Sequence, residues 1–218
     1  MIGFSLASAG LAQQLAARPA LPGSLNTNRM LDGWLRINAD GTVTVFDLTT
    51  LKPTGEIKAG ENPDAVIYDE FSKRVIVMNG RSKDLMAIDP DSLKVVATIP
   101  LGGKLEFAAS EKGHIYVNVE DTGEIASVDS HSWKLEQRWK LEGCEEPSGL
   151  ALDPRSHHLF AVCGNSQMFV VDSRSGKVVD KVATGAGTDA AVFDSDKKLI
   201  FTSNGEGTLT VVRQAKGG

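Results

Sequence analysis

The sequence predicts an all-β fold, a β-propeller with four-stranded antiparallel blades, and two observations lead to that prediction. The first is a short pattern that occurs four times: Asp, then Ser or Thr three positions later, then Lys two further on. The leading residues are 42, 40 and 43 positions apart, and they are Asp47, Asp89, Asp129 and Asp172. The second is that apolar, β-branched runs flank each occurrence, for example residues 43–46 and 95–99. A period of about 42 residues made of hairpins is typical of a propeller or a similar array.

Taken in order, each period divides into four expected strands separated by turn residues. The first full unit is expected to hold strands at 64–68, 74–78, 85–89 and 94–99. Asp and Ser side chains at the repeated pattern can bond nearby backbone amides and so close the turn before the last strand. The Asn79-Gly80 pair falls between the second and third strands, where a two-residue turn needs positive φ. Two further units are expected over 105–141 and 147–183.

The two ends of the repeat region are incomplete. Three strands are expected before the first full unit, near 35–38, 42–46 and 55–58, and three after the last, at 189–193, 199–203 and 208–212. Propellers usually close by pairing their termini within one blade, but here the strands at the two ends are partly redundant. We therefore expect a partial propeller of about four to five blade positions, forming an open arc. Open edges of this kind favour self-association.

Residues 1–33 are expected to be separate from the propeller, which occupies 34–218. Residues 2–12 are apolar and small, and Gly10-Leu11-Ala12 would suit signal-peptide cleavage, although no basic residue precedes Arg18. The segment is interpreted as a truncated export signal, with a plain flexible terminus as the alternative, followed by a Pro- and Gly-containing linker at 18–24. The predicted location is the periplasm.

Charge and composition narrow the class of partner. The net charge is −5 with a pI near 5.4, which argues against nucleic-acid binding because phosphates require clustered Lys and Arg. No apolar run is long enough to span a membrane. The expected partner is an unidentified protein or small molecule, and no cofactor is expected.

The repeats resemble the YVTN-type (YncE-like) β-propeller family over about residues 38–213. The resemblance lies in residues 60–65, 74–80, 145–153 and 162–165, which read GENPDA, RVIVMNG, EEPSGLALD and VCGN. It implies a seven-bladed propeller that is often exported and has no assigned reaction. The present repeats are too few for seven blades.

Residues 1–46 resemble a different family, the molybdenum-binding subunit of isoquinoline-type oxidoreductases. The matching stretches are residues 3–7, 21–25 and 31–46. That family continues with a glycine-rich, cofactor-binding segment, whereas this chain continues with Asp47-Leu48-Thr49-Thr50. The resemblance therefore supports export of the segment and implies no catalytic residue.

Acidic residues recur where the innermost strand of each blade begins, beside the expected axis. Asp64, Glu106 and Asp189 occupy one position of the repeat, and Glu146 stands two residues before the equivalent Ser148. Converging carboxylates could hold Ca²⁺ or a cationic ligand. The alternative is that they cap strand ends and face water. These four are the candidate ligand-binding residues, and no catalytic or metal-ligating set is predicted.

Cys144 and Cys163 are the only cysteines, and the expected strand positions place them side by side. A disulfide would form in an oxidising compartment, and two buried free thiols are the alternative. The sequence shows no nucleophile beside a histidine and no phosphate-binding loop. We therefore expect an exported, non-enzymatic binding or scaffold module, with a lactonase-like, metal-assisted hydrolase built on the four carboxylates as the alternative.

Overall fold

The computed structural model describes residues 33–38 and 40–215, and these form five antiparallel sheets in chain order. The first sheet has three strands: β1 (Gly33–Ile37), β2 (Thr42–Asp47) and β3 (Pro53–Lys58). The second has four: β4 (Pro63–Asp69), β5 (Arg74–Asn79), β6 (Asp84–Asp89) and β7 (Lys94–Pro100). The third has four and a short 3₁₀ turn: β8 (Leu105–Glu111), β9 (His114–Val119), η2 (Glu120–Thr122), β10 (Glu124–Asp129) and β11 (Lys134–Lys140). The fourth has β12 (Pro147–Asp153), β13 (His158–Cys163), β14 (Gln167–Asp172) and β15 (Val178–Ala183), and the fifth has β16 (Thr188–Asp194), β17 (Leu199–Asn204) and β18 (Leu209–Arg213).

The repeated Asp pattern closes the turn between the third and fourth strands of a sheet. In the second sheet Asp89 Oδ1 accepts hydrogen bonds from the amides of Asp91 and Ser92 and from the Ser92 hydroxyl. The next residue, Leu93, has a φ of 57°, so the chain reverses through a left-handed position. Asp172 makes the same bonds with Arg174 and Ser175. The turns expected at the repeated Asp pattern are confirmed, and their local bonds explain why the strand boundaries there were predictable. The expected two-residue turn at Asn79-Gly80 is wrong: residues 80–83 connect β5 to β6, and the residue with positive φ is Lys83, at 60°.

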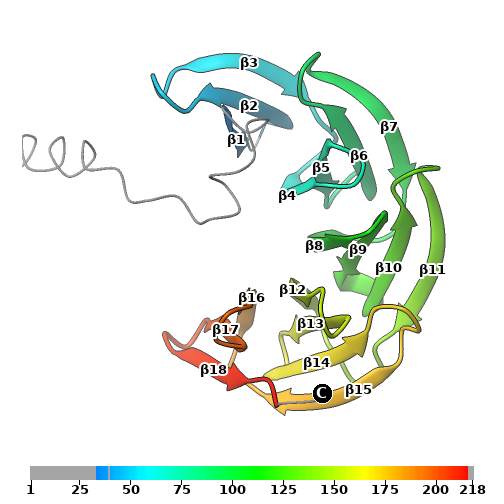
Figure 1. The fold of residues 1–218 in the computed structure, drawn as a ribbon, viewed down its shortest axis with the longest axis vertical. Helices are drawn as coiled ribbons and strands as arrows, with labels where there is room; N and C mark the ends of the chain where they lie inside the picture. Colours follow the sequence, from blue (N-terminus) through cyan, green and yellow to red (C-terminus); the bar gives the residue numbers. More distant parts are fainter. Residues whose placement is uncertain (1–32, 39, 216–218) are drawn as a thin grey trace, which may run out of the picture.

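The sheets follow one another around an open arc (Figure 1). The first strands of the four later sheets, β4, β8, β12 and β16, lie on the concave side, and neighbouring sheets contact one another through these strands. The sheets β1–β3 and β16–β18 stand at opposite ends of the arc and share no strand pairing. The expected open arc of propeller blades, with three strands at each end, is therefore confirmed for the described residues.

Apolar contacts between successive sheets form the core. Between the second and third sheets the fully buried side chains include Ile76, Leu85, Leu105, Ile115 and Val128. Both faces of a middle strand are covered by neighbouring sheets, so β5 and β6 are almost continuously apolar, whereas the outer strand β11 is largely exposed and polar. In the described part of the chain, no helix is long and apolar enough to cross a membrane.

Candidate functional site

Every inner strand has a β-bulge at its entry, on the concave side of the arc. Strand pairing skips from Pro63 to Ala65 in β4 and from Thr188 to Ala190 in β16, which leaves one residue unpaired in each. The equivalent interruption falls between 105 and 108 in β8 and between 147 and 150 in β12. A bulge redirects a side chain out of the regular ladder, and bulges often lie beside functional sites. The residues at these four bulges, which we call the bulge row, are Asp64, Glu106, Ser148 and Asp189.

Three of the four carboxylates predicted from the sequence belong to the bulge row, and the fourth does not. Asp64 and Asp189 are exposed, and Glu106 is half-buried. Glu146 is exposed and precedes β12, with a φ of 50°. Among the described residues no group of three or more His, Cys, Asp or Glu side chains is arranged to hold a metal ion. The carboxylates of the bulge row therefore lie on successive blades along the arc and do not surround one shared point.

Glu106 has the most unusual electrostatic surroundings of the row. Lys104 Nζ lies 2.9 Å from Glu106 Oε1 and also pairs with Glu120. Burial raises the pKa of Glu106 to about 7, and the hydrogen bond to Glu120 and the charge of Asp64 add to the increase, against the opposing effect of Lys104. Glu106 therefore exchanges its proton near neutral pH, and it senses the charge of Asp64 on the neighbouring blade.

The partners of Glu106 have pKa values shifted in the directions that this cluster requires. The pKa of Lys104 is raised, mainly by its bond to Glu120. Burial alone would raise the pKa of Glu120, but hydrogen bonds with Glu106 and Lys104 outweigh it and lower that pKa. At neutral pH the cluster thus holds an ammonium group between an ionised Glu120 and a Glu106 that is near half-protonation.

A polar pocket of about 500 Å³ lies next to this cluster, between the third and fourth sheets. Its carboxylates are those of Glu120, Asp121, Glu145 and Glu146, with the Lys140 side chain as the cation. Glu146, predicted from the sequence as a ligand-binding residue, therefore lines this pocket. The surplus of carboxylates gives the pocket a negative charge that favours a cationic or hydrogen-bond-donating group.

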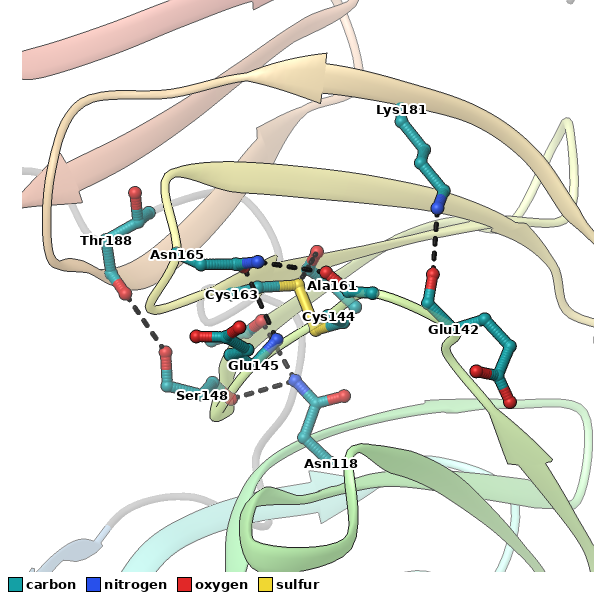
Figure 2. The surroundings of a disulfide bond; sticks show 12 residues. Asn118, Glu142, Cys144, Glu145, Ser148, Ala161, Cys163, Asn165, Lys181 and Thr188 are labelled. Atoms are coloured by element: carbon teal, nitrogen blue, oxygen red, sulfur yellow. Dashed lines mark hydrogen bonds between the residues drawn. A yellow bond between two sulfur atoms is a disulfide. The ribbon is translucent and has the colours of Figure 1, made fainter.

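The loop leading into β12 is fixed by a disulfide between Cys144 and Cys163, whose Cα atoms are 5.4 Å apart. Figure 2 shows the surrounding hydrogen bonds, in which Asn118 Nδ2 donates to the Ser148 carbonyl at 2.9 Å and Lys181 Nζ donates to the Glu142 carbonyl at 2.9 Å. Asn118 belongs to the third sheet, so its bond links two neighbouring blades beside the bulge row. These contacts hold the pocket wall and Ser148 in place.

At the opposite ends of the inner strands, buried acids contact the following blade. His157 Nδ1 lies 2.8 Å from Glu111 Oε1, and Lys198 Nζ lies 3.1 Å from Asp153 Oδ2. The acids are almost completely buried, while His157 and Lys198 occupy the left-handed position just before the second strand of the next sheet. Sequence reasoning did not identify these pairs or the Lys104–Glu120 contact. The available signal was an acid at the end of each inner strand, which recurs in every repeat.

Comparison with known proteins finds similarity to two curated proteins. No family model matches the chain. The chain is 24% identical over 201 residues, 84% of its length, to uncharacterized protein YncE of Salmonella typhimurium. It is also 24% identical over 197 residues to the protein of that name from Salmonella typhi. The chain spans 56% of the length of each of these relatives.

The second resemblance, to a molybdenum hydroxylase subunit, is not shown by these comparisons. Residues 1–32 lie outside the described residues, and the rest of the matching stretch forms β1 and β2 of the first blade. Where that family continues with a glycine-rich segment, Asp47 of this chain opens the first repeated turn. The sequence similarity and the blade architecture together support a YncE-like β-propeller.

Proposed function

We propose that the protein is a non-enzymatic, exported propeller that binds a partner through the bulge row on its concave side. The observation that supports this most directly is the bulge at the equivalent place in all four inner strands, three of which carry an acidic residue there. Repeat architectures commonly use a concave surface for binding, with the scaffold residues buried between repeats. The described residues offer this surface without a metal-binding group.

The chemistry of the row indicates a partner with cationic or hydrogen-bond-donating groups. Asp64 and Asp189 are exposed and able to accept hydrogen bonds, and Glu106 exchanges its proton near neutral pH. Phe107, in the same bulge as Glu106, is 43% exposed and adds an apolar contact surface. A basic, partly apolar protein segment matches this combination, because charge complementarity steers association and apolar burial strengthens it.

Export is proposed from the signal-like start and from the disulfide. Disulfides persist in oxidising compartments and are rare in the cytosol. Fractionation of the native cells, with alkylation of thiols before lysis, tests this proposal. Recovery of the chain in the cytosolic fraction with Cys144 and Cys163 both alkylated would contradict it.

The binding proposal is tested by capturing partners from periplasmic extract on immobilised protein. The variant Asp64→Asn/Glu106→Gln/Asp189→Asn removes the carboxylates of the row and should lose the specific partner. The matched control is Asp180→Asn, which changes an exposed acid on the outer strand β15 and should retain it. Failure to recover any partner specific to the wild-type row, together with a measurable turnover, would overturn the proposal.

One observation also favours the metal-assisted hydrolase as a second candidate. A carboxyl group with a pKa of about 7, such as Glu106, is suited to general acid–base catalysis near neutral pH. That function requires the carboxylates to bind a divalent cation such as Ca²⁺. Calorimetric titration should then give more heat with the wild type than with a variant in which Asp64, Glu106, Glu146 and Asp189 are alanine, and equal heats would eliminate this candidate.

A further inference from the structure

The third sheet carries a large apolar side chain at the entry of its inner strand, where the other inner strands carry a small residue or none. Phe107 directly follows Glu106 of the bulge row and is 43% exposed. The residues at the equivalent position of the other three inner strands are Ala65, Gly149 and Ala190. Packing between sheets therefore does not need a phenylalanine there. Because β8 lies between β4 and β12 (Figure 1), the exposure of Phe107 does not come from either end of the arc.

The same entry has a second distinguishing side chain, at the residue that follows the second strand of the sheet. This residue is Glu120 in the third sheet, and it is glycine in the other three: Gly80, Gly164 and Gly205. The backbone is alike, since the Glu120 amide donates to the Lys104 carbonyl at 2.8 Å just as the Gly80 amide donates to the Asn62 carbonyl. Side chains, and not the course of the chain, therefore make the entry of the third sheet different.

The ammonium group of Lys104 fills the space between the two acids at this entry. Lys104 Nζ lies 2.9 Å from Glu106 Oε1 and also pairs with Glu120. The two glutamate side chains are only 18% and 20% exposed, so they offer little surface beyond the part that Lys104 contacts. The backbone of Lys104 is itself held, because its amide donates to Asp121 Oδ1 at 2.8 Å. A second cation can therefore bind Glu106 and Glu120 only by displacing Lys104.

The acids of the bulge row on the second and fifth sheets lack such a neutralising residue. Asn62 and Gly187 stand at the position of Lys104 in these sheets, and neither side chain is charged. Asp64 and Asp189 are both exposed. Along the arc, the row thus offers an open carboxylate on each side of an entry that is apolar and already occupied by a cation.

We propose that the entry of the third sheet is an apolar subsite of the bulge row, in which Phe107 contacts an apolar side chain of the partner and Lys104 excludes a cation from Glu106 and Glu120. This inference rests on the proposed function and specifies the partner. The partner is an extended protein segment with an apolar side chain between basic ones, and the basic side chains meet Asp64 and Asp189. Aromatic contacts near the centre of an interface carry much of its binding energy, while charged contacts favour the correct partner and its orientation.

Three synthetic peptides test the apolar contact by calorimetric titration at physiological ionic strength. Each is an acetylated and amidated hexapeptide with two lysines at either end, and its middle pair is leucine, glycine or lysine. Wild type should bind the leucine peptide about tenfold more tightly than the glycine peptide, which carries the same charge. Phe107→Ala should remove this preference. Val179→Ala, which truncates a 53% exposed valine on the outer strand β15, is the control and should keep it.

The lysine peptide tests the exclusion of a cation by Lys104. Lys104→Met should bind this peptide about tenfold more tightly than wild type does, because Glu106 and Glu120 are then free to accept its ammonium groups. The matched control is Lys83→Met, which removes the same charge from a more exposed ion pair with Asp121 and should change the affinity less. Lys104→Gln keeps a hydrogen-bond donor for the two acids and replaces the methionine variant if melting curves show that the latter does not fold.

The possible outcomes separate this subsite from the proposed function. Equal affinity of wild type for the leucine and glycine peptides, an unchanged preference in Phe107→Ala, or equal affinities of Lys104→Met and Lys83→Met for the lysine peptide would each overturn the subsite. The triple variant Asp64→Asn/Glu106→Gln/Asp189→Asn tests the row as a whole. If it binds all three peptides as wild type does, the proposed function fails as well. If it loses binding while Phe107→Ala keeps its preference, the subsite alone is wrong.

Discussion

Replacing Lys198 with methionine tests how much a buried acid contributes to the contact between the fourth and fifth sheets. Asp153 ends the inner strand β12 and is 1% exposed, and Lys198 reaches it from the following sheet at 3.1 Å. Methionine keeps most of the length and apolar character of the lysine side chain but removes the charge. The change therefore isolates the ion pair from the packing.

The expected cost is set by the stabilisation of the Asp153 carboxylate. Burial alone would raise the pKa of Asp153, but hydrogen bonds from Ser156 and Arg155 and the ion pair with Lys198 outweigh it and lower that pKa to about 2 from an ordinary 3.8. This lowering corresponds to about 2.5 kcal/mol, shared among the three partners. Lys198 is about one-third exposed, which reduces its share to about 1 kcal/mol. Loss of its contact over the Phe193 ring adds about 0.5 kcal/mol.

Urea unfolding at two pH values measures this effect. Because the folded-state pKa of Asp153 lies below its unfolded value, the stabilisation is complete above about pH 4 and is lost as the pH falls through about 2. Lys198→Met should therefore cost about 1–1.5 kcal/mol at pH 7 and much less near pH 2. Lys197→Met is the control, since its ion pair with Asp194 is solvent-exposed, and it should cost under about 0.5 kcal/mol. If Lys198→Met costs the same in an Asp153→Asn background as in wild type, the two residues are not coupled and the reasoning fails.

Three further predictions concern Glu106, two turn glycines and the disulfide. Folding raises the pKa of Glu106 to about 7, so ionisation of this carboxyl lowers the free energy of unfolding as the pH rises through 7. Between pH 5 and pH 8, the Glu106→Gln variant should therefore gain about 2 kcal/mol of stability relative to wild type, measured by urea unfolding. Gly176→Ala should cost about 2–3 kcal/mol of stability, because φ is +70° and an added Cβ would meet the Trp139 ring at 2.3 Å. Gly207→Ala should cost only about 1 kcal/mol, because φ is +88° but the space around the residue is open. Equal shifts of the melting temperature for the two variants would contradict this reasoning. Reducing the disulfide should destabilise wild type by about 3 kcal/mol and leave a Cys163→Ala variant unaffected, as read from melting curves with and without reductant.

The sheets were predictable from the sequence because their turns are specified locally. An Asp that binds the amides two and three residues ahead needs no distant partner, so the repeated pattern marks the turn wherever it occurs. The alternation of β-branched residues then places the strands between successive turns. Equivalent positions on successive inner strands follow from the period, which is why Asp64, Glu106 and Asp189 were correctly assigned to one row.

The pKa shifts and ion pairs of the site were not predictable from the sequence, because they depend on distances between side chains of different strands and different blades. The pKa of Glu106 is raised by burial, by the hydrogen bond to Glu120 on the turn after β9, and by the charge of Asp64 of the preceding sheet. The His157 contact crosses from the fourth sheet to Glu111 of the third. A single sequence gives the period and the turn chemistry but no distance between side chains of successive repeats.

At the rim opposite the bulge row, three of the inter-blade junctions are closed by three different sets of side chains. Phe71 covers Gly113 between the second and third sheets, Glu111 meets His157 at the next junction, and Asp153 meets Lys198 at the last. In an array whose sheets contact only their neighbours, stability is a sum of such junctions. A sheet that ends an array without a partner requires a polar outer face. The fifth sheet instead presents valine and leucine at positions that are buried in the second sheet, so its sequence has the character of one more junction.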